Sequence, residues 1–351
     1  MVRASSTTQS SGTMRAIVLE KNSPSGPATL HLRELARQTP RPGEVVVALK
    51  AASLNRRDVW IRLGRYVGIR LPCVLGSDGA GVVAAVGAGV RPELCGQAVV
   101  VNPSLGWGPD PAVQGPDYRV LGMPDAGTYA AELVVPAANV VAMPPHLSFS
   151  EAAALPLAGL TAYRALCTRG QLRPGETVLI PGIGGGVSTM ALIFAKHRGA
   201  RVIVTSSSNE KLAVARSLGA DFGVNYRCVD WADLIAQKYG RTPIDLAVDS
   251  AGADSLSQCV NLVRPGGRIV SYGATAGIAS INIHKIFWRQ LNLLGSTMGN
   301  AQDFAEMIAT VDAGKLRPII DQVLPLADAD KAHARMEQSA HMGKIVLHIA
   351  D

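Results

Sequence analysis

The sequence predicts an α/β fold with two domains, a β-barrel-like domain and a domain built on a doubly wound parallel sheet. The chain has 351 residues, and at roughly 100–200 residues per domain this length accommodates two hydrophobic cores. From Met14 to about Pro145, short β-rich runs alternate with segments rich in Pro and Gly, as in barrels. From about Leu147, apolar strands alternate with helices, as in parallel sheets with helical crossovers.

The first domain is predicted from apolar runs that alternate with polar residues or are continuous over strand length. They lie at residues 14–20, 29–35, 44–55, 80–90, 98–103 and 129–143. A helical segment, RRDVWIRLGR at 56–65, interrupts them. Residues 103–127 are rich in Gly and Pro and show no periodicity, so we expect a long loop there.

The second domain is predicted from regular alternation of strands and helices after a helical segment at 150–170. Strands are expected at 177–181, 201–205, 222–226, 245–250 and 267–273, with helices at 187–199, 209–219, 231–240 and 254–263. A helix at 301–313, a strand at 318–324, a helix at 328–339 and a strand at 344–349 follow. We interpret these last elements as a return to the first domain.

The strongest single motif is a glycine turn between a predicted strand and the helix that follows it. The turn consists of Gly182, Gly184, Gly185, Gly186 and Val187. The match to G-x-G-x-x-G is imperfect, because Val187 stands at the third glycine position. Such a turn lets the backbone approach a pyrophosphate and directs the N–H groups of the helix N-terminus toward it. The alternative is that these glycines serve only the close packing of helix on sheet.

The end of the next strand distinguishes the two nicotinamide cofactors. A site that prefers NAD places Asp or Glu there, about 20 residues after the turn, to accept a hydrogen bond from the ribose 2′-hydroxyl. This strand ends instead in Ser206 and Ser207, and Lys211 follows shortly after. Hydroxyls and a cation favour the 2′-phosphate of NADPH, and NADH is the less favoured cofactor. Alternatively, Ser208 or Asn209 serves only to cap the next helix.

The string LPCVLGSDGAGVVAAVGAGV at 71–90, the glycine turn and the order of the two domains resemble the medium-chain dehydrogenase/reductase superfamily. The resemblance covers Met14 to Asp351 and is closest to the zinc-free, quinone oxidoreductase-like branch, whose members are often labelled zinc-type alcohol dehydrogenase-like. It implies a GroES-like catalytic β-barrel domain at 14–148 and 300–351, and a Rossmann domain that binds NAD(P) at 149–299.

The chain departs from the zinc-dependent members of that superfamily at their metal ligands. Those members carry a Cys shortly before a Thr/Ser-Asp pair, and a His in a Gly-His-Glu motif. This chain has Asn55-Arg56-Arg57-Asp58 at the first place and Gly76-Ser77-Asp78 at the second. The segment 103–127, where the structural zinc lobe would fall, contains no Cys. Zinc prefers thiolate and imidazole ligands, so we expect no metal site.

The resemblance implies three catalytic residues. Tyr66, in a Gly-x-Tyr context, resembles the proton-donating Tyr of enoyl reductases, and Asn55 resembles the Asn near the nicotinamide in quinone oxidoreductases. Thr161, in GLTAY, matches a family Thr beside the nicotinamide. The alternatives are an exposed loop aromatic for Tyr66 and a turn-forming amide for Asn55. Asp58 is expected to order its loop by pairing with a nearby Arg.

Four further residues are expected at the cofactor. Tyr226 resembles the Tyr that stacks near the adenosine 2′-phosphate, and Phe287 resembles the segment whose backbone contacts the carboxamide. Ser250 and Gly273 stand at the carboxyl ends of two predicted strands. Open α/β sheets bind ligands at the carboxyl ends of their strands, which places both residues at the cofactor.

The function implied by the resemblance is NADPH-dependent reduction of quinones or α,β-unsaturated carbonyls, by hydride transfer without zinc. Such electrophilic substrates need only a hydrogen-bond or proton donor at the carbonyl oxygen. Alcohol oxidation without a metal lacks a Lewis acid for the developing alkoxide. An alcohol or aldehyde dehydrogenase of the same superfamily, and an NADPH-binding protein with a structural role, are the alternatives.

Composition restricts the partners. The net charge of +7 is spread along the chain, whereas nucleic-acid binders concentrate basic residues in one stripe, so we expect a small-molecule substrate and no nucleic acid. No apolar run approaches the roughly 20 residues that cross a bilayer, so no membrane partner is expected. The five arginines within 55–70 either favour an anionic substrate or form a solvated basic face. The resemblance implies a homodimer or homotetramer.

The cysteines bear on the compartment. All five are widely spaced and form no C-x-x-C pair, which suits a reducing environment and predicts a cytoplasmic protein. Residues 1–13 are rich in Ser and Thr and contain no acid. We interpret them as a disordered extension or, alternatively, as the remnant of a plastid or mitochondrial transit peptide.

Overall fold

The structure is a computed structural model that describes residues 12–21, 27–227 and 230–349. Their contacts divide them into two units. Unit 1 comprises the described residues within Met1–Pro156, Gln322–Ala340 and Ile345–Asp351, and unit 2 those within Leu157–Asp321 and His341–Lys344. Of the predicted N-terminal extension 1–13, residues 1–11 lie outside the described residues, and the first strand already begins at Thr13.

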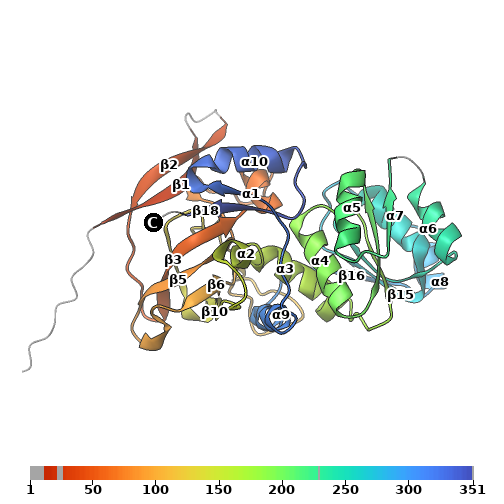
Figure 1. Cartoon of the computed structure of the whole chain (residues 1–351), viewed down its shortest axis with the longest axis horizontal. Coiled ribbons are helices and arrows are strands. Elements are labelled where there is room, and N and C mark those ends of the chain that lie inside the picture. The colour runs from red at the N-terminus through yellow and green to blue at the C-terminus, as the bar shows by residue number, and fades with distance from the viewer. Residues whose placement is uncertain (1–11, 22–26, 228–229, 350–351) are drawn as a thin grey trace, which may run out of the picture. The chain divides into compact units, whose positions relative to one another are not determined.

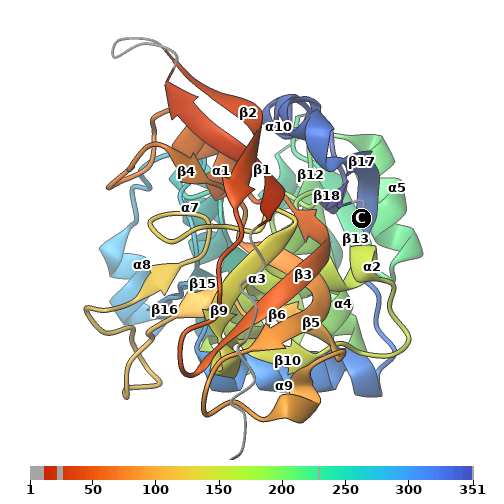
Figure 2. The ribbon, with the colours of Figure 1, turned by 90° about the vertical axis from the view of Figure 1, so that its left-hand side faces the viewer.

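Unit 1 is built around antiparallel strands that follow the predicted apolar runs. Among the described residues its largest sheet has the order β10 (Val140–Ala142), β6 (Ala98–Val101), β5 (Asp78–Val86), β3 (Glu44–Ser53), β18 (Lys344–His348) and β17 (Ile320–Pro325), with β9 (Glu132–Pro136) also paired to β3. Figure 2 shows β3, β5, β6 and β10 side by side. Gly81 allows the close approach of β5 to β3, because a Cβ there would lie 2.1 Å from the Ala48 carbonyl oxygen.

Smaller elements complete unit 1. They are the three-stranded sheet of β1 (Thr13–Lys21), β2 (Ala28–Ala36) and β4 (Cys73–Val74), the pair β7 (Ser104–Leu105) and β8 (Arg119–Val120), and the helices α1 (Arg56–Arg62), α2 (Phe149–Ala153) and α10 (Ala329–Glu337). The predicted loop 103–127 is irregular apart from β7 and β8. In the part of the chain that the structure describes, no helix has both the length and the apolarity to cross a membrane.

Unit 2 contains the predicted doubly wound sheet. Its described strands have the order β13 (Phe222–Asn225), β12 (Arg201–Ser206), β11 (Thr177–Ile180), β14 (Ile244–Asp249), β15 (Val263–Ser271) and β16 (Asn292–Gly295). All of these neighbours pair in parallel. This is the order 3-2-1-4-5-6 of a dinucleotide-binding sheet, and its direction of winding reverses between β11 and β14. The structure therefore confirms the predicted fold class.

Most helices of unit 2 follow the predicted segments, whereas α8 (Ile283–Trp288) and the strand β16 after it were not predicted. The helices are α3 (Pro156–Tyr163), the π-helical turn η3 (Arg164–Arg169), α4 (Gly186–His197), α5 (Asn209–Ser217), α6 (Trp231–Tyr239), α7 (Ala253–Leu262), α8 and α9 (Ala301–Ala313) (Figure 1). The helix predicted over 150–170 is divided, because Pro156 lacks the N–H that would continue α2. Pro156 instead opens α3, where a missing N–H costs nothing.

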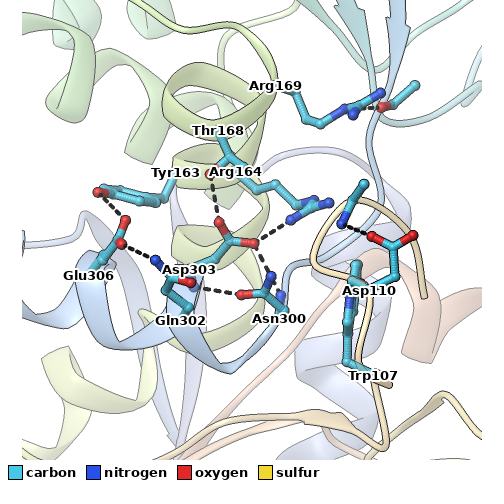
Figure 3. Close-up of polar contacts among 12 residues, drawn as sticks. Trp107, Asp110, Tyr163, Arg164, Thr168, Arg169, Asn300, Gln302, Asp303 and Glu306 are labelled. Atoms are coloured by element: carbon cyan, nitrogen blue, oxygen red, sulfur yellow. Dashed lines mark hydrogen bonds and ion pairs between the residues drawn. The ribbon is translucent and has the colours of Figure 1, made fainter. Parts of the chain in front are cut away.

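The grouping of the C-terminal elements differs from the predicted domain boundaries. Residues 300–321 and 341–344 group with unit 2, although the domain predicted at 300–351 would assign them to the barrel. The reason is a buried polar network that joins α9 to η3 (Figure 3). Asp303 forms an ion pair with Arg164 and accepts a hydrogen bond from Thr168 Oγ1 at 2.6 Å. Both side chains of this ion pair are buried, and a buried charge is costly without its partner, so the pair holds α9 against η3.

Candidate functional site

The glycine turn lies at the carboxyl end of β11, beside the point where the sheet reverses. The backbone N–H of Ile183 donates to the Thr205 carbonyl oxygen at 2.7 Å, and that of Gly182 donates to Thr205 Oγ1 at 3.1 Å. On its other side, the Gly343 N–H donates to the Gly184 carbonyl oxygen at 2.8 Å. The turn is therefore held from both sides, and inside it the Gly184 N–H donates to Ser188 Oγ at 3.2 Å.

The individual glycines have different reasons for lacking a side chain. Gly182 has φ +69°, which favours glycine. At Gly186 a Cβ would lie 2.5 Å from Lys344 Cδ and 3.1 Å from Ala158 Cβ, so this glycine provides close helix packing. Gly185 has an ordinary φ of −82°, and a Cβ there would meet no atom within 4 Å. Gly185 is thus free of both constraints.

This distribution explains the imperfect motif. In a standard fingerprint the third glycine serves the packing of helix on strand. In this chain that role falls to Gly186, one residue before Val187. The packing interpretation therefore applies to Gly186, and the binding interpretation stays a prediction for Gly185, where a Cβ would meet no atom within 4 Å.

The predicted adenosine end gathers around the carboxyl ends of β12 and β13. Tyr226 is 43% exposed, and its N–H donates to the Ser206 carbonyl oxygen at 3.0 Å. Ser206 itself is buried, and its hydroxyl donates to the Ile183 carbonyl oxygen at 3.3 Å, so it braces the turn. Lys211 extends over the turn, with Nζ 3.2 Å from the point where a Gly184 Cβ would stand. Ser207 is half-buried at the strand tip.

The alternative role of the serines is also realised. Ser208 is the N-cap of α5, and its Oγ accepts a hydrogen bond from the Lys211 N–H at 3.2 Å. This cap fixes the start of the helix from which the Lys211 side chain extends. Among the three serines, Ser208 thus orders the helix and Ser206 supports the turn, while the cofactor role of Ser207 stays a prediction.

The predicted nicotinamide end collects loops that follow β14, β15 and β16. A Cβ at Gly273 would lie 3.0 Å from the Ser250 carbonyl oxygen, so these two predicted residues are neighbours. Thr161 is buried in α3, with Oγ1 3.9 Å from Met298 Sδ. The Ser296 hydroxyl is buried and has no hydrogen-bond partner among the described residues. A buried hydroxyl without a partner at this edge fits a polar ligand group.

Phe287 is the predicted cofactor residue that the structure sets apart. It lies on α8 with 61% of its surface exposed, and its ring contacts His284. The helix ends beside Arg289, which donates to the Val260 carbonyl oxygen, and the Arg289 carbonyl oxygen accepts from the Gly266 N–H. These contacts lie at the start of β15, at the end of the sheet opposite to the glycine turn.

Two residues that the sequence argument missed join the site in unit 2. Met298 contacts Thr161, and it follows β16 directly, so the rule that ligands bind after parallel strands would have identified its segment. Lys344 is only 3% exposed and packs against Gly186. No sequence rule links Lys344 to the turn, because the contact depends on the return of a distant segment.

In unit 1, Asn55 belongs to a buried acidic cluster, which we call the Asp58 cluster: Asn55, Asp58, Asp78 and Tyr129. The Asn55 N–H donates to Asp58 Oδ2 at 2.8 Å, and Asn55 Nδ2 donates to Asp78 Oδ2 at 2.9 Å. The Tyr129 hydroxyl donates to Asp58 Oδ2 at 3.1 Å. Burial raises the pKa of Asp58, and this effect exceeds the lowering by the adjacent Arg57 guanidinium. Asn55 caps α1 and holds the carboxylates in place.

Tyr66 lies in the turn after α1, and its ring faces a buried arginine. The Arg57 Cζ is 5.2 Å from the Tyr66 ring centroid. Arg57 Nη1 donates to Ser77 Oγ and to the Leu121 carbonyl oxygen, both at 2.8 Å, and Nη2 donates to the Met123 carbonyl oxygen at 3.0 Å. We call these residues the Arg57 cluster. Asp58 orders this region through Asn55 and Tyr129, with Arg57 as an electrostatic neighbour.

The side chains present do not fit a catalytic zinc ion. The two positions that match zinc ligands in the superfamily hold Asn55 and Ser77, an amide and a hydroxyl, and Ser77 is bound to a guanidinium. Among the described residues, no three His, Cys, Asp or Glu side chains gather in an arrangement that could hold a metal. Zinc prefers thiolate and imidazole, which this donor set does not offer.

Comparison with known proteins places both units in one family. Residues 41–145 match the alcohol dehydrogenase GroES-like domain, and residues 186–313 match the zinc-binding dehydrogenase domain. The zinc-type alcohol dehydrogenase-like protein YogA of Leptosphaeria maculans is 34% identical over 91% of this chain and 94% of its own length.

Solved structures agree with this assignment. A crystal structure of an NAD-dependent alcohol dehydrogenase is 40% identical, with a TM-score of 0.87 over 96% of this chain and 100% of its own. The 2-octenoyl-CoA carboxylase reductase CinF, in complex with NADP and 2-octenoyl-CoA, is 27% identical, with a TM-score of 0.87 over 97% of this chain and 88% of its own. The chain is therefore an oxidoreductase of the medium-chain dehydrogenase/reductase superfamily and belongs to its zinc-type alcohol dehydrogenase-like branch.

Proposed function

We propose that this enzyme reduces α,β-unsaturated carbonyls or quinones with NADPH and works without zinc. The observation that carries the cofactor part of the proposal is Gly185, a glycine that neither backbone conformation nor packing requires. The structure of the relative CinF, solved with NADP and 2-octenoyl-CoA, supports both the cofactor and the substrate class.

Unit 2 would hold the cofactor along the carboxyl edge of its sheet. The N–H groups after Gly184 would meet the pyrophosphate, and Ser207 and Lys211 would meet the 2′-phosphate. No carboxylate stands at the tip of β12 to repel that phosphate. Ser296 Oγ and the backbone near Met298 would meet the nicotinamide end. When bound, the reduced nicotinamide supplies a hydride.

Unit 1 would provide the proton donor for the substrate oxygen and the residues that hold this donor in position. An enone or quinone that accepts a hydride at carbon develops negative charge on its oxygen. The Tyr66 hydroxyl would donate a proton to that oxygen, with water restoring the phenol. The Asp58 cluster would keep α1, and therefore the turn that bears Tyr66, in a fixed position. This route needs no Lewis acid, which agrees with donors at Asn55 and Ser77 that do not suit zinc.

The direct test is oxidation of NADPH, followed by absorbance, against a panel of quinones, enals, enones and saturated aldehydes. Parallel assays with NADH, with EDTA and with added zinc separate the parts of the proposal. We expect turnover of activated C=C bonds or quinones, faster with NADPH and insensitive to chelation. Activity confined to aldehydes and restored by zinc after chelation would overturn it.

A second function is favoured by one comparison. The NAD-dependent alcohol dehydrogenase at 40% identity supports alcohol oxidation or aldehyde reduction, with NAD as the cofactor. The same assay panel decides between the two, because an alcohol dehydrogenase oxidises primary or secondary alcohols with NAD and leaves enones unreduced.

We also propose that the enzyme acts as a homodimer or homotetramer. On unit 2, apolar side chains are exposed along α8 and β16, namely Ile283, Phe287, Trp288 and Leu293. In the described sheet β16 is an edge strand, and exposed apolar edges favour association. Light scattering after size exclusion should give a multiple of the 36.7 kDa chain mass, and Trp288→Glu should lower it. A monomeric wild-type enzyme would contradict this proposal.

A further inference from the structure

Arg57 occupies the part of unit 1 that corresponds to the metal-ligand motifs of zinc-dependent relatives. It stands two residues after Asn55, which replaces their Cys, and it bonds Ser77, which replaces their His. Arg57 is 9% exposed. A fixed positive charge thus lies beside the residue where relatives would place a metal ligand.

The guanidinium also joins three separate segments. Its two terminal nitrogens reach Ser77 after β4 and the carbonyl oxygens of Leu121 and Met123 in the loop 103–127. Its face lies against the Tyr66 ring. A metal ion fixes an active site in the same way, by holding ligands from distant segments around one positive charge.

The charges around Arg57 indicate why a cation is needed there. Asp58 and Asp78 are both fully buried, and the positive charge of Arg57 acts on Asp58. Burying two carboxylates without a cation nearby is costly. Other titratable neighbours of the guanidinium are the phenols of Tyr66 and Tyr129 and the thiol of Cys73. Arg57 Nε is buried and has no hydrogen-bond partner among the described residues, so one N–H donor of the guanidinium is unused.

We infer that Arg57 is the resident cation of this site, a positioning residue that takes over the charge and the bridging role that zinc has in metal-dependent relatives. It would hold the Tyr66 ring through its face and the loop 103–127 through its edge. For the role of Tyr66 and for the absence of zinc this inference rests on the proposed function, whereas the bridging role of Arg57 does not.

Substitutions separate charge from geometry. Arg57→Lys keeps the charge but cannot span Ser77 and two carbonyls, because an ammonium lacks the planar fork of a guanidinium. Arg57→Met removes both. Arg91→Met, at an exposed arginine of the same unit, is the matched control. We expect melting temperatures in the order wild type and Arg91→Met, then Arg57→Lys, then Arg57→Met, with the last lowered by roughly 5–15 °C.

A kinetic readout distinguishes positioning from general stability. Arg57→Lys should lower kcat on the order of tenfold or more, because the proton donor is displaced, and leave KM for NADPH unchanged. Equal kcat and melting temperature for wild type and Arg57→Lys would overturn the inference.

Measurements on the wild-type enzyme test whether it binds zinc. Metal analysis should find well below one zinc per chain, and millimolar EDTA or added zinc should leave the melting temperature unchanged. One tightly bound zinc whose removal lowers the melting temperature would overturn the inference, even if Arg57→Met fails to fold. The melting temperatures of the Arg57 variants need no substrate, so failure of the bridging role is distinguishable from failure of the proposed function, whereas a bound zinc ion would overturn the zinc-free part of both.

Discussion

The glycine turn of unit 2 and the Arg57 cluster of unit 1 form opposite kinds of site. The turn leaves space, because Gly185 presents bare backbone with no neighbour within 4 Å of its missing side chain. The Arg57 cluster fills space, because a buried guanidinium binds Ser77 and two backbone carbonyls. The comparison teaches that the proposed cofactor site depends on a missing side chain at Gly185, whereas the proposed substrate site depends on a buried side chain, Arg57.

The largest expected effect tests the substrate end. Tyr66→Phe removes only a hydroxyl that makes no hydrogen bond to any described residue, so stability should be unchanged. If Tyr66 is the proton donor, kcat for enone reduction should fall by about 10²–10⁴-fold, the usual contribution of general acid catalysis. Tyr239→Phe in unit 2 is the control. Wild-type turnover by Tyr66→Phe would remove this residue from the mechanism.

The next effect compares two adjacent glycines. Gly185→Ala should weaken NADPH binding tenfold or more, which is about 1.4 kcal/mol, and leave the melting temperature unchanged, because its Cβ enters empty space. Gly186→Ala should cost about 1–3 kcal/mol of stability through overpacking against Lys344. Calorimetry of binding and of unfolding checks both. If Gly185→Ala binds NADPH like the wild type, the cradle is misassigned.

Cofactor choice should respond to a single charge at the tip of β12. Ser207→Asp places a carboxylate where a 2′-phosphate would lie and where a ribose 2′-hydroxyl could donate to it. The ratio of kcat/KM for NADPH to that for NADH should fall at least about tenfold, a repulsion of roughly 1.4 kcal/mol. Ser217→Asp, at the exposed last residue of α5, the helix that follows β12, controls for added charge. An unchanged ratio contradicts the assignment.

The smallest effect concerns His333, which packs behind the Asp58 cluster against the Tyr129 ring. Both of its ring nitrogens lack a hydrogen-bond partner, and burial, followed by the charge of Arg62, lowers its pKa to about 3. The unfolded chain binds a proton at this residue below its ordinary pKa of about 6.5, whereas the folded chain does not. The free energy of unfolding should therefore fall as the pH falls from about 6.5 toward 3.

His333→Leu isolates that contribution. Between pH 7 and pH 5 the wild type should lose about 2 kcal/mol more than the variant, because the slope approaches 1.36 kcal/mol per pH unit. Urea unfolding at the two pH values measures it. Parallel losses in both proteins would show that His333 accepts a proton in the folded state.

The sequence predicts the fold well where local rules decide it. The strands and helices around the glycine turn follow apolar periodicity, and the helix predicted at 301–313 is α9 to the residue. The grouping of α9 with unit 2 could not be predicted from the sequence, because it depends on an ion pair between distant segments, Arg164 and Asp303.

The candidate site divides in the same way. The position of Ser250 and Gly273 follows from the rule for strand ends, and the structure makes them neighbours. Phe287 was chosen by similarity of a short string, and its helix lies at the other end of the sheet. The burial of Ser206 and the partners of Arg57 depend on three-dimensional packing that no spacing in the chain encodes.

The hydrogen bond from Gly343 to Gly184 has a consequence for the order in which the enzyme is made. During synthesis the nucleotide-binding sheet leaves the ribosome long before residues 341–344 do. Until that segment arrives, the turn lacks its outer brace and Lys344 is missing from its position against α4. A nascent chain should thus form its nucleotide-binding sheet early but bind its cofactor late. Cofactor binding would then wait until the last barrel strand, β18, has also been synthesised.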